Sequence, residues 1–165
     1  MTQDCCFTEG KNWFRYRAAA IIVEGGCVLL VGNEKEDYLY SVGGGVHHGE
    51  TAREAVLREV LEETGVKYEI DRLAVIHENF WNGDGAYDKG LSCHEISLYF
   101  LMKPRGTQEL NSDSYTHFKD KESMVWIPID ELNSHRFYPT FLKDYLDTKH
   151  DAVEHIITDE RMAGS

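Results

Sequence analysis

The chain has 165 residues, a hydrophobic fraction of 42% and a formal net charge of −12. This size and composition are typical of one globular domain, which can fold without disulfides or a structural metal. The excess of 29 Asp and Glu over 17 Lys and Arg disfavours binding to nucleic-acid backbones and anionic membranes, because like charges repel. If the substrate is itself an anion, a divalent metal is the obvious mediator.

The N-terminus lacks the basic and apolar regions of a signal peptide, and no apolar run reaches the length of a membrane-spanning helix. Four cysteines without a C-x-x-C pair indicate free thiols in a reducing compartment. We therefore expect a cytoplasmic protein that binds neither a membrane nor a nucleic acid. The oligomeric state, including a homodimer, is left open.

The first part of the chain predicts a polar segment, a hairpin and a short strand. Residues 1–12 are polar and are expected to form a loosely ordered N-terminal segment. Residues 15–31 predict two strands around a Gly25-Gly26 turn, and residues 38–42 predict a short strand that ends in glycines.

The clearest helix is predicted over residues 52–64, which contain neither Gly nor Pro. Thr51 and Glu54 form a capping-box pattern at its start, and Gly65 supplies a left-handed stop at its end.

Further strands are predicted at residues 66–80, 92–102 and 123–129. Pro139 opens a final helix that runs to about residue 149. Strands around one central helix, with a second helix near the end, predict a single α/β domain with a mixed sheet. This domain is expected over residues 13–158, followed by a C-terminal tail at residues 159–165.

The central helix has two chemically different faces on a wheel of about 3.6 residues per turn. The apolar stripe, which we expect to pack on the sheet, consists of Val56, Leu57, Val60 and Leu61. A second arc carries Glu59, Glu62 and Glu63, with Ala52 and Ala55 beside them and Arg58 within reach. A hard divalent cation explains this crowding, because Mg2+ takes carboxylate oxygens together with water and substrate phosphate. The alternative is a solvated acidic helix face.

A nucleotide-binding P-loop is excluded at the glycine-rich turn before this helix. Gly44, Gly49 and Thr51 have the spacing of that motif. The position of its phosphate-binding lysine is Glu50, which has the wrong charge.

The segment from Gly44 to Val66 resembles the Nudix box of the Nudix hydrolases, G-x5-E-x7-R-E-U-x-E-E-x-G-U, in which U is a bulky aliphatic residue. All nine defined positions match: Gly44, Glu50, Arg58, Glu59, Val60, Glu62, Glu63, Gly65 and Val66. One departure precedes the box, since Val42 stands where many members have Pro. The resemblance implies an α/β/α sandwich and metal-dependent cleavage of a pyrophosphate bond in a nucleoside diphosphate linked to another group.

The resemblance also implies a site for Mg2+ or Mn2+. The expected metal ligands are the Gly44 carbonyl and the carboxylates of Glu59, Glu62, Glu63 and Glu122. The expected catalytic residues are Glu59, Glu62, Arg58 and Glu122, with Arg58 orienting the glutamates. The base that deprotonates the attacking water is left open between a box glutamate and a carboxylate from a later loop.

Glu122 is chosen as the carboxylate outside the box, ahead of Glu95, Glu109 and Asp120. It precedes Trp126 by four residues, which resembles members that cleave nucleoside triphosphates. A solvated loop glutamate is the alternative. Glu95 alternates with Ile96 in a strand, so it either reaches the metal site or pairs with a basic residue.

His47, Phe80 and Trp81 are the expected substrate contacts, His47 from the loop that faces the site and the aromatic rings by stacking on a base. Tyr87, Tyr115 and Phe118 are further stacking candidates. The alternatives are a surface position for His47 and core positions for the rings.

A second function class is a Nudix-fold module that binds a nucleotide without turnover. Such modules typically lose box glutamates, and all are present here. Removal of pyrophosphate from RNA 5′ ends is disfavoured by the net charge of −12. The sequence does not support ADP-ribose, since Trp81-Asn82 stands where that subfamily has Pro, and the motif of the coenzyme A class is missing. The substrate is otherwise open among nucleoside triphosphates, dinucleotides and nucleotide sugars.

Overall fold

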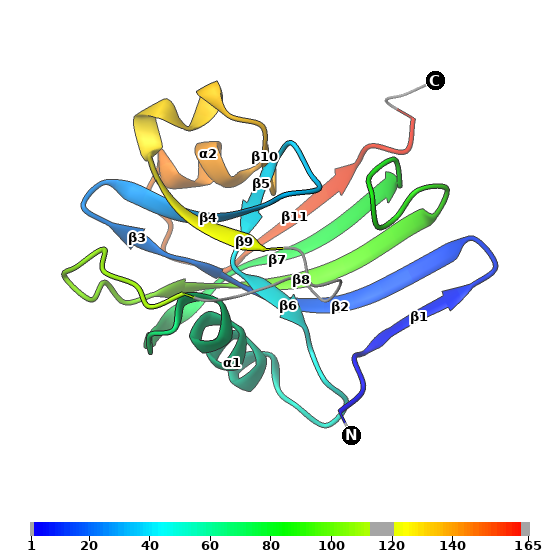
Figure 1. Ribbon diagram of the computed structural model, residues 1–165, viewed down its shortest axis with the longest axis horizontal. Helices are drawn as coiled ribbons and strands as arrows, with labels where there is room; N and C mark the ends of the chain where they lie inside the picture. Colours follow the sequence, from blue (N-terminus) through cyan, green and yellow to red (C-terminus); the bar gives the residue numbers. More distant parts are fainter. Residues whose placement is uncertain (1, 113–120, 163–165) are drawn as a thin grey trace.

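The computed structural model describes residues 2–112 and 121–162, which form two sheets (Figure 1). The larger sheet contains, in spatial order, β1 (Cys6–Glu9), β2 (Asn12–Ile21), β8 (Ser92–Met102), β7 (Ile70–Asn82) and β11 (Glu154–Asp159), with β6 (Gly43–Gly45) paired to β2. The smaller contains β10 (Phe137–Tyr138), β5 (Leu39–Ser41), β4 (Cys27–Asn33) and β3 (Val23–Glu24), with β9 (Glu122–Pro128) paired to β4. β2 and β8 are parallel whereas β7 and β8 are antiparallel, so the predicted mixed sheet is confirmed.

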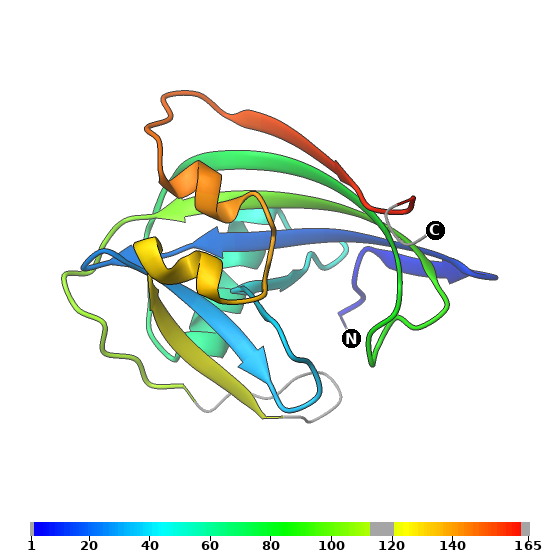
Figure 2. The ribbon, with the colours of Figure 1, turned by 90° about the horizontal axis from the view of Figure 1, so that it is seen from above.

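Helices cover the strands on two sides. The helix α1 (Ala52–Thr64) lies on one side, and the 3-10 helix η1 (Ile129–Ser134) and α2 (Leu142–Leu146) lie on the other. Turned by 90°, the strands are seen between α1 and α2 (Figure 2). This arrangement confirms the α/β/α sandwich.

Strand β2 separates the two hydrophobic cores, because successive side chains of a strand point to opposite faces. Ala18 and Ala20 belong to the core under α1. Ala19 and Ile21 belong to the core under η1 and α2. The small alanines let layers on both sides approach the strand closely.

The predicted limits of α1 are confirmed. Both hydrogen bonds of the Thr51–Glu54 capping box are present, and Gly65 ends the helix in the left-handed conformation with φ 73°. The Gly25-Gly26 turn also joins two strands, β3 and β4, as predicted.

The predicted buried face of α1 is partly wrong. Val56 and Val60 are fully buried, but Leu57 and Leu61 are 41% and 40% exposed. Ala52 and Ala55 take their place in the core. The helix is rotated so that its small residues and part of its acidic face approach the sheet.

The N-terminal segment is more regular than predicted. Residues Cys6–Glu9 form β1, which pairs antiparallel with Asn12–Arg15 of β2. Gly10, with φ 59°, allows the tight turn between them. A long neighbouring strand thus supplies hydrogen bonds that the composition of residues 1–12 does not reveal.

The last elements also differ from the prediction. The final helix spans only Leu142–Leu146, shorter than the expected 139–149. β11 follows it and pairs in parallel with β7 as far as Asp159, the first residue of the expected tail.

An aromatic row crosses the large sheet, formed by Phe7 of β1, Phe14 of β2, His94 of β8 and Phe80 of β7. Its ring centroids are 5.5 Å apart for Phe7 and Phe14, 5.2 Å for Phe14 and His94, and 4.4 Å for His94 and Phe80. The guanidinium of Arg161 lies 4.6 Å from the Phe80 centroid and completes the row.

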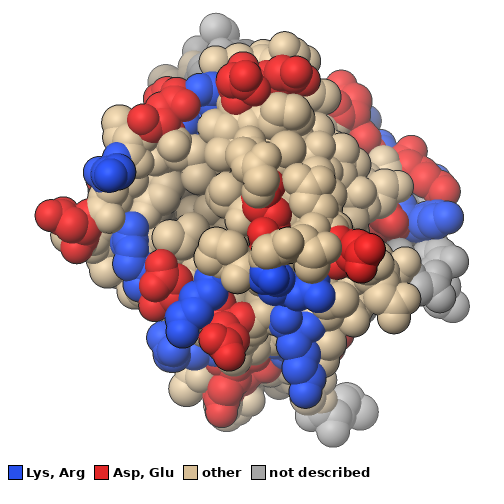
Figure 3. All heavy atoms as spheres, turned by 90° about the vertical axis from the view of Figure 1, so that its left-hand side faces the viewer, with Lys and Arg blue, Asp and Glu red and all other residues tan. Residues whose placement is uncertain are grey.

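The face on the left of Figure 1 has a mostly uncharged hollow at its centre (Figure 3). Lys and Arg side chains around this hollow are interspersed with Asp and Glu.

Within residues 2–112 and 121–162, no helix is long and apolar enough to cross a membrane.

The rotation of α1 predicts that the smaller of two truncations is the more damaging. Val60→Ala should lower the free energy of unfolding by about 2 kcal/mol, because it empties fully buried space. Leu57→Ala should cost less than about 1 kcal/mol, since that side chain is already partly in water. Urea denaturation of both variants measures the difference, and a larger loss for Leu57→Ala would contradict the observed rotation.

Candidate active site

The site is built where the loop around β6 passes over α1. Gly44 lies in β6 opposite Ala18 of β2, and its backbone packs directly on the Glu59 side chain. A Cβ atom on residue 44 would lie 2.5 Å from the carboxyl carbon of Glu59. A side chain at residue 44 would therefore displace the Glu59 carboxylate from its present position.

Arg58 ties the loop to the helix. Its Nε and Nη2 donate to the two carboxylate oxygens of Glu50 at 2.8 Å and 3.0 Å. Nη2 also donates to the Gly45 carbonyl at 3.1 Å, and Nη1 donates to Glu59 Oε1 at 2.5 Å. The hydrogen bonds from Arg58 lower the pKa of Glu50 and keep it ionised.

Glu63 is the most deeply placed carboxylate of the box, with 8% of the residue exposed. The Gly43 N–H donates to Glu63 Oε1 at 3.4 Å. Its Oε2 is buried without a hydrogen-bond partner in the part of the chain that the structure describes. Burial, and then the charges of Glu122 and Glu59, raise the pKa of Glu63 well above its ordinary value.

The other two box glutamates differ from Glu63 in exposure. Burial raises the pKa of Glu59, although Arg58 opposes the shift. Glu62 points to solvent with 58% of its side chain exposed, and its carboxylate lies 3.5 Å from Arg58 Nη1. The three glutamates are neighbours on the helix, but Glu59 and Glu63 face inward and Glu62 does not.

Glu122 comes to this place from the smaller sheet. It is the first residue of β9, opposite Asn33 of β4, and it is half-buried. Its charge acts on Glu63 and on Tyr40 of β5, whose pKa is raised chiefly by burial. Gly44, Glu59, Glu63 and Glu122 thus approach one another from three separate elements.

These residues fit a hard divalent cation. Over residues 2–112 and 121–162, no group of three or more His, Cys, Asp or Glu side chains is placed, as the side chains stand, to hold a metal ion. The ionised form of Glu63 nevertheless needs a positive partner at its buried oxygen, and the neighbours of that oxygen are carboxylates and a glycine backbone. Oxygen donors of this kind are those that Mg2+ and Mn2+ prefer.

Arg17 is a site residue that the sequence analysis missed. It is 6% exposed and donates to the Ser41 carbonyl at 2.8 Å and to the Tyr99 hydroxyl at 3.2 Å. Its charge stabilises the ionised forms of Glu63 and Glu59. The available signal was a charged residue directly before the apolar strand residues 18–22.

Glu95 is engaged elsewhere. Arg15 Nη2 lies 2.6 Å from Glu95 Oε2, and Ser97 Oγ donates to Glu95 Oε1 at 3.0 Å. Burial opposes its ionisation, but Arg15 and Arg17 more than offset that cost and lower its pKa. The sequence left open whether Glu95 reaches the metal site or pairs with a basic residue, and the structure shows the pair with a basic residue.

His47 lies in the loop between β6 and α1 and contacts the N-terminal segment. Its Nε2 is 3.3 Å from Asp4 Oδ1, and its backbone N–H donates to Glu50 Oε2 at 2.9 Å. The expected substrate contact is thus held between two carboxylates of its own chain.

Phe80 and Trp81 point to opposite faces of β7, as successive strand residues must. A ligand on one face therefore contacts only one of them. Trp81 donates from Nε1 to Asp88 at 2.7 Å and shares its face with Glu95, the partner of Asn79 in the register. Phe80 stacks on His94 on the other face.

Two further candidates are not brought to the site. Glu109 and Tyr87 are exposed in loops. Tyr115, Phe118 and Asp120 lie outside the described residues.

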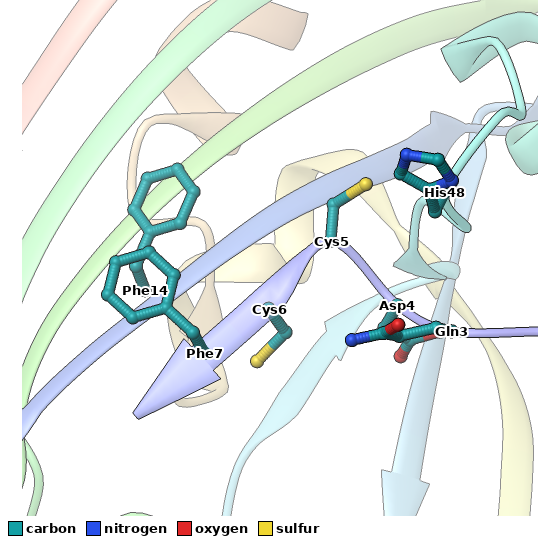
Figure 4. Close-up of a pocket in the computed structure, with 7 residues that line it drawn as sticks. All are labelled: Gln3, Asp4, Cys5, Cys6, Phe7, Phe14 and His48. Carbon is teal, nitrogen blue, oxygen red and sulfur yellow. The ribbon is translucent and has the colours of Figure 1, made fainter. Parts of the chain in front are cut away.

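A shallow pocket of about 310 Å3 adjoins the same loop from the N-terminal side (Figure 4). It is lined by residues 3–7 together with Phe14 and His48. None of the expected metal ligands lines it, so it is separate from the carboxylate cluster.

Comparison with known proteins identifies the class of molecule. A family model described as NUDIX domain matches residues 13–147. A MutT-like protein of Streptomyces ambofaciens is 27% identical over 139 residues, 84% of this chain and 79% of that protein. The chain belongs to the NUDIX domain family, and it is a Nudix-type pyrophosphohydrolase of nucleoside diphosphate derivatives.

Solved structures share the fold. The MutT protein from Methanosarcina mazei Go1 has a TM-score of 0.61 at 18% identity, covering 85% of this chain and 94% of that one. The MutT NUDIX hydrolase from Burkholderia pseudomallei has a TM-score of 0.59 at 22% identity, covering 79% of this chain and 95% of that one.

The Glu95 pair predicts a pH-dependent stability. Because the pKa of Glu95 is lowered on folding, its contribution is present above the unfolded value near 4.5 and is lost as pH falls through the folded pKa. Glu95→Gln should lower the free energy of unfolding by about 3 kcal/mol or more at pH 7, since it leaves buried arginine charge uncompensated. The deficit should shrink below about pH 4.

Urea denaturation across this pH range measures the effect. Glu69→Gln is the matched control, because Glu69 pairs with Lys103 at 3.4 Å with 80% of its side chain exposed. It should change stability by less than about 0.5 kcal/mol. A deficit of Glu95→Gln that is constant with pH would contradict the assignment.

Proposed function

We propose that the protein hydrolyses a pyrophosphate bond in a nucleoside triphosphate or a related nucleotide, with Mg2+ or Mn2+ bound by the carboxylate cluster. The observation that carries the proposal is the buried Oε2 of Glu63, which lies near Glu59 and Glu122 and has no hydrogen-bond partner among the residues that the structure describes. A buried anion without a partner is costly, and a bound cation would remove that cost.

Each residue has a part in the proposal. The carboxylates of Glu59, Glu63 and Glu122 and the Gly44 carbonyl would hold the metal, and Glu62 would serve a second ion from its exposed position. When bound, such an ion neutralises phosphate charge and lowers the pKa of water. Arg58 holds Glu59 and Glu50 in place through its hydrogen bonds.

The proton of the attacking water would pass to a nearby carboxylate, and Glu122 is our choice. Its half-buried place on β9 lies across from α1, where it is coupled electrostatically to Glu63. Glu95 is unsuited to this task, because Arg15 and Ser97 already occupy its two oxygens.

The substrate side is proposed to be the face of the large sheet that carries Arg17. Trp81 shares this face and is the better stacking candidate, whereas Phe80 lies on the opposite face. The alternative from the sequence analysis is a non-catalytic nucleotide-binding module. The intact set of box glutamates favours catalysis.

Metal removal tests the proposal first. With Mg2+ or Mn2+ the protein should hydrolyse at least one compound in a panel of nucleoside triphosphates, dinucleotides and nucleotide sugars, scored by phosphate or pyrophosphate release. EDTA should abolish this activity and added metal should restore it. Equal turnover in EDTA would rule out the metal, and binding without turnover would favour the non-catalytic module.

Glu63→Gln should separate catalysis from folding. Activity should fall at least about a hundredfold, because a metal-binding carboxylate is lost. The melting temperature without metal should hold or rise, since burial and repulsion already disfavour the charge of Glu63. Glu69→Gln is again the control and should leave both quantities unchanged. A large loss of metal-free stability in Glu63→Gln would instead support a structural role.

Glu122→Gln tests the choice of base. It should lower kcat well over tenfold with the fold intact by circular dichroism, because general acid–base groups contribute about 10²–10⁴. Normal turnover in Glu122→Gln, together with loss of turnover in a folded Glu95→Gln, would assign the role to the strand residue.

A further inference from the structure

The N-terminal segment is attached to the loop of the Nudix box by backbone hydrogen bonds. The Cys5 N–H donates to the Val46 carbonyl at 2.8 Å, and the His48 N–H donates to the Gln3 carbonyl at 2.7 Å. These bonds lie on either side of Asp4, so they fix its backbone against the loop.

The Asp4 side chain contacts the loop at two points (Figure 4 shows it beside Gln3). Its Oδ1 is 3.3 Å from His47 Nε2, and 53% of the side chain is exposed. Its Oδ2 would lie 2.6 Å from a Cβ atom on Gly45, so the carboxylate packs directly on this glycine.

Gly45 and His47 are also the residues through which the loop reaches α1. The Gly45 carbonyl accepts from Arg58 Nη2 at 3.1 Å, and the His47 N–H donates to Glu50 Oε2 at 2.9 Å. Arg58 in turn binds Glu50 and Glu59. A short chain of contacts therefore leads from Asp4 to the carboxylate cluster.

We propose that Asp4 is a positioning residue for hydrolysis, which holds the loop so that the Gly44 carbonyl and Glu59 face the metal together. Asp4 lies outside residues 13–147, which the family model matches, and its side chain contacts the loop at Gly45 and His47. The inference rests on the proposed function.

The competing explanation is that the N-terminal segment only adds stability. The pairing of β1 with β2 already provides such a role. Metal affinity separates the two, since a purely structural contact would change the melting temperature and leave the metal site of the folded protein unaltered.

The test uses the full chain with Asp4→Asn, which keeps the size of the side chain and removes its charge. Mn2+ binding is measured without substrate by electron paramagnetic resonance, well below the melting temperature. We expect the Mn2+ dissociation constant to rise about tenfold and kcat at fixed subsaturating metal to fall about tenfold, as for other supports of metal ligands. KM for the nucleotide should stay the same, because the proposed effect of Asp4 is on the loop that holds the metal.

Asp147→Asn is the matched control. Asp147 has 49% of its side chain exposed and pairs with Lys143 at 2.5 Å at the end of α2. Figure 1 shows α2 on the side of the molecule opposite α1. This variant should bind Mn2+ as the wild type does.

A double variant tests the route of the effect. Asp4→Asn combined with His47→Gln should be no worse than the more severe single variant, because residues that act through one contact are not additive. Wild-type Mn2+ affinity in Asp4→Asn would overturn the inference, even with a lower melting temperature, and so would full additivity. If the wild-type protein hydrolyses nothing in the panel, the proposed function fails, and Mn2+ binding still decides the role of Asp4.

Discussion

One constraint shapes much of the structure: α1 turns the carboxylates of Glu59 and Glu63 away from water. Glu63 is nearly buried and Glu59 is half-buried, and both have raised pKa values as a consequence. Arg58 and the buried Arg17 reduce the cost but do not satisfy every oxygen. The alanines on the same side of α1, the glycine at position 44 and the exposure of two leucines all follow from making room for these charges.

The sequence predicted those parts of the fold that short-range chemistry decides. The capping box at Thr51 and the left-handed Gly65 set the limits of α1, and both patterns depend on neighbouring residues only. The spacing of the box also placed Glu59, Glu62 and Glu63 on one helix, where the structure has them. A helical wheel gives relative positions and not the direction of the core, so Leu57 and Leu61 were misplaced.

The parts of the fold and site that were not predicted depend on contacts between residues that are distant in sequence. β1 forms because β2 is there to pair with it, and Glu95 is fixed by Arg15, which is 80 residues away. Arg17 and Arg58 at the site, and Arg15 in the same strand as Arg17, are already engaged with the protein's own carboxylates or hydroxyls. A protein of net charge −12 therefore offers an anionic substrate little free positive charge from these side chains, so the proposed metal would serve recognition as well as chemistry.

The aromatic row at the far end of the large sheet has a mechanical consequence. There the strands run on beyond α1 (Figure 1), so a helix does not brace them. Phe7, Phe14, His94 and Phe80 come from four adjacent strands, and each inner ring contacts the ring on either side. Sliding one inner strand along its axis would break two ring contacts at once. The protruding part of the sheet therefore resists the sliding of its strands past one another as a unit.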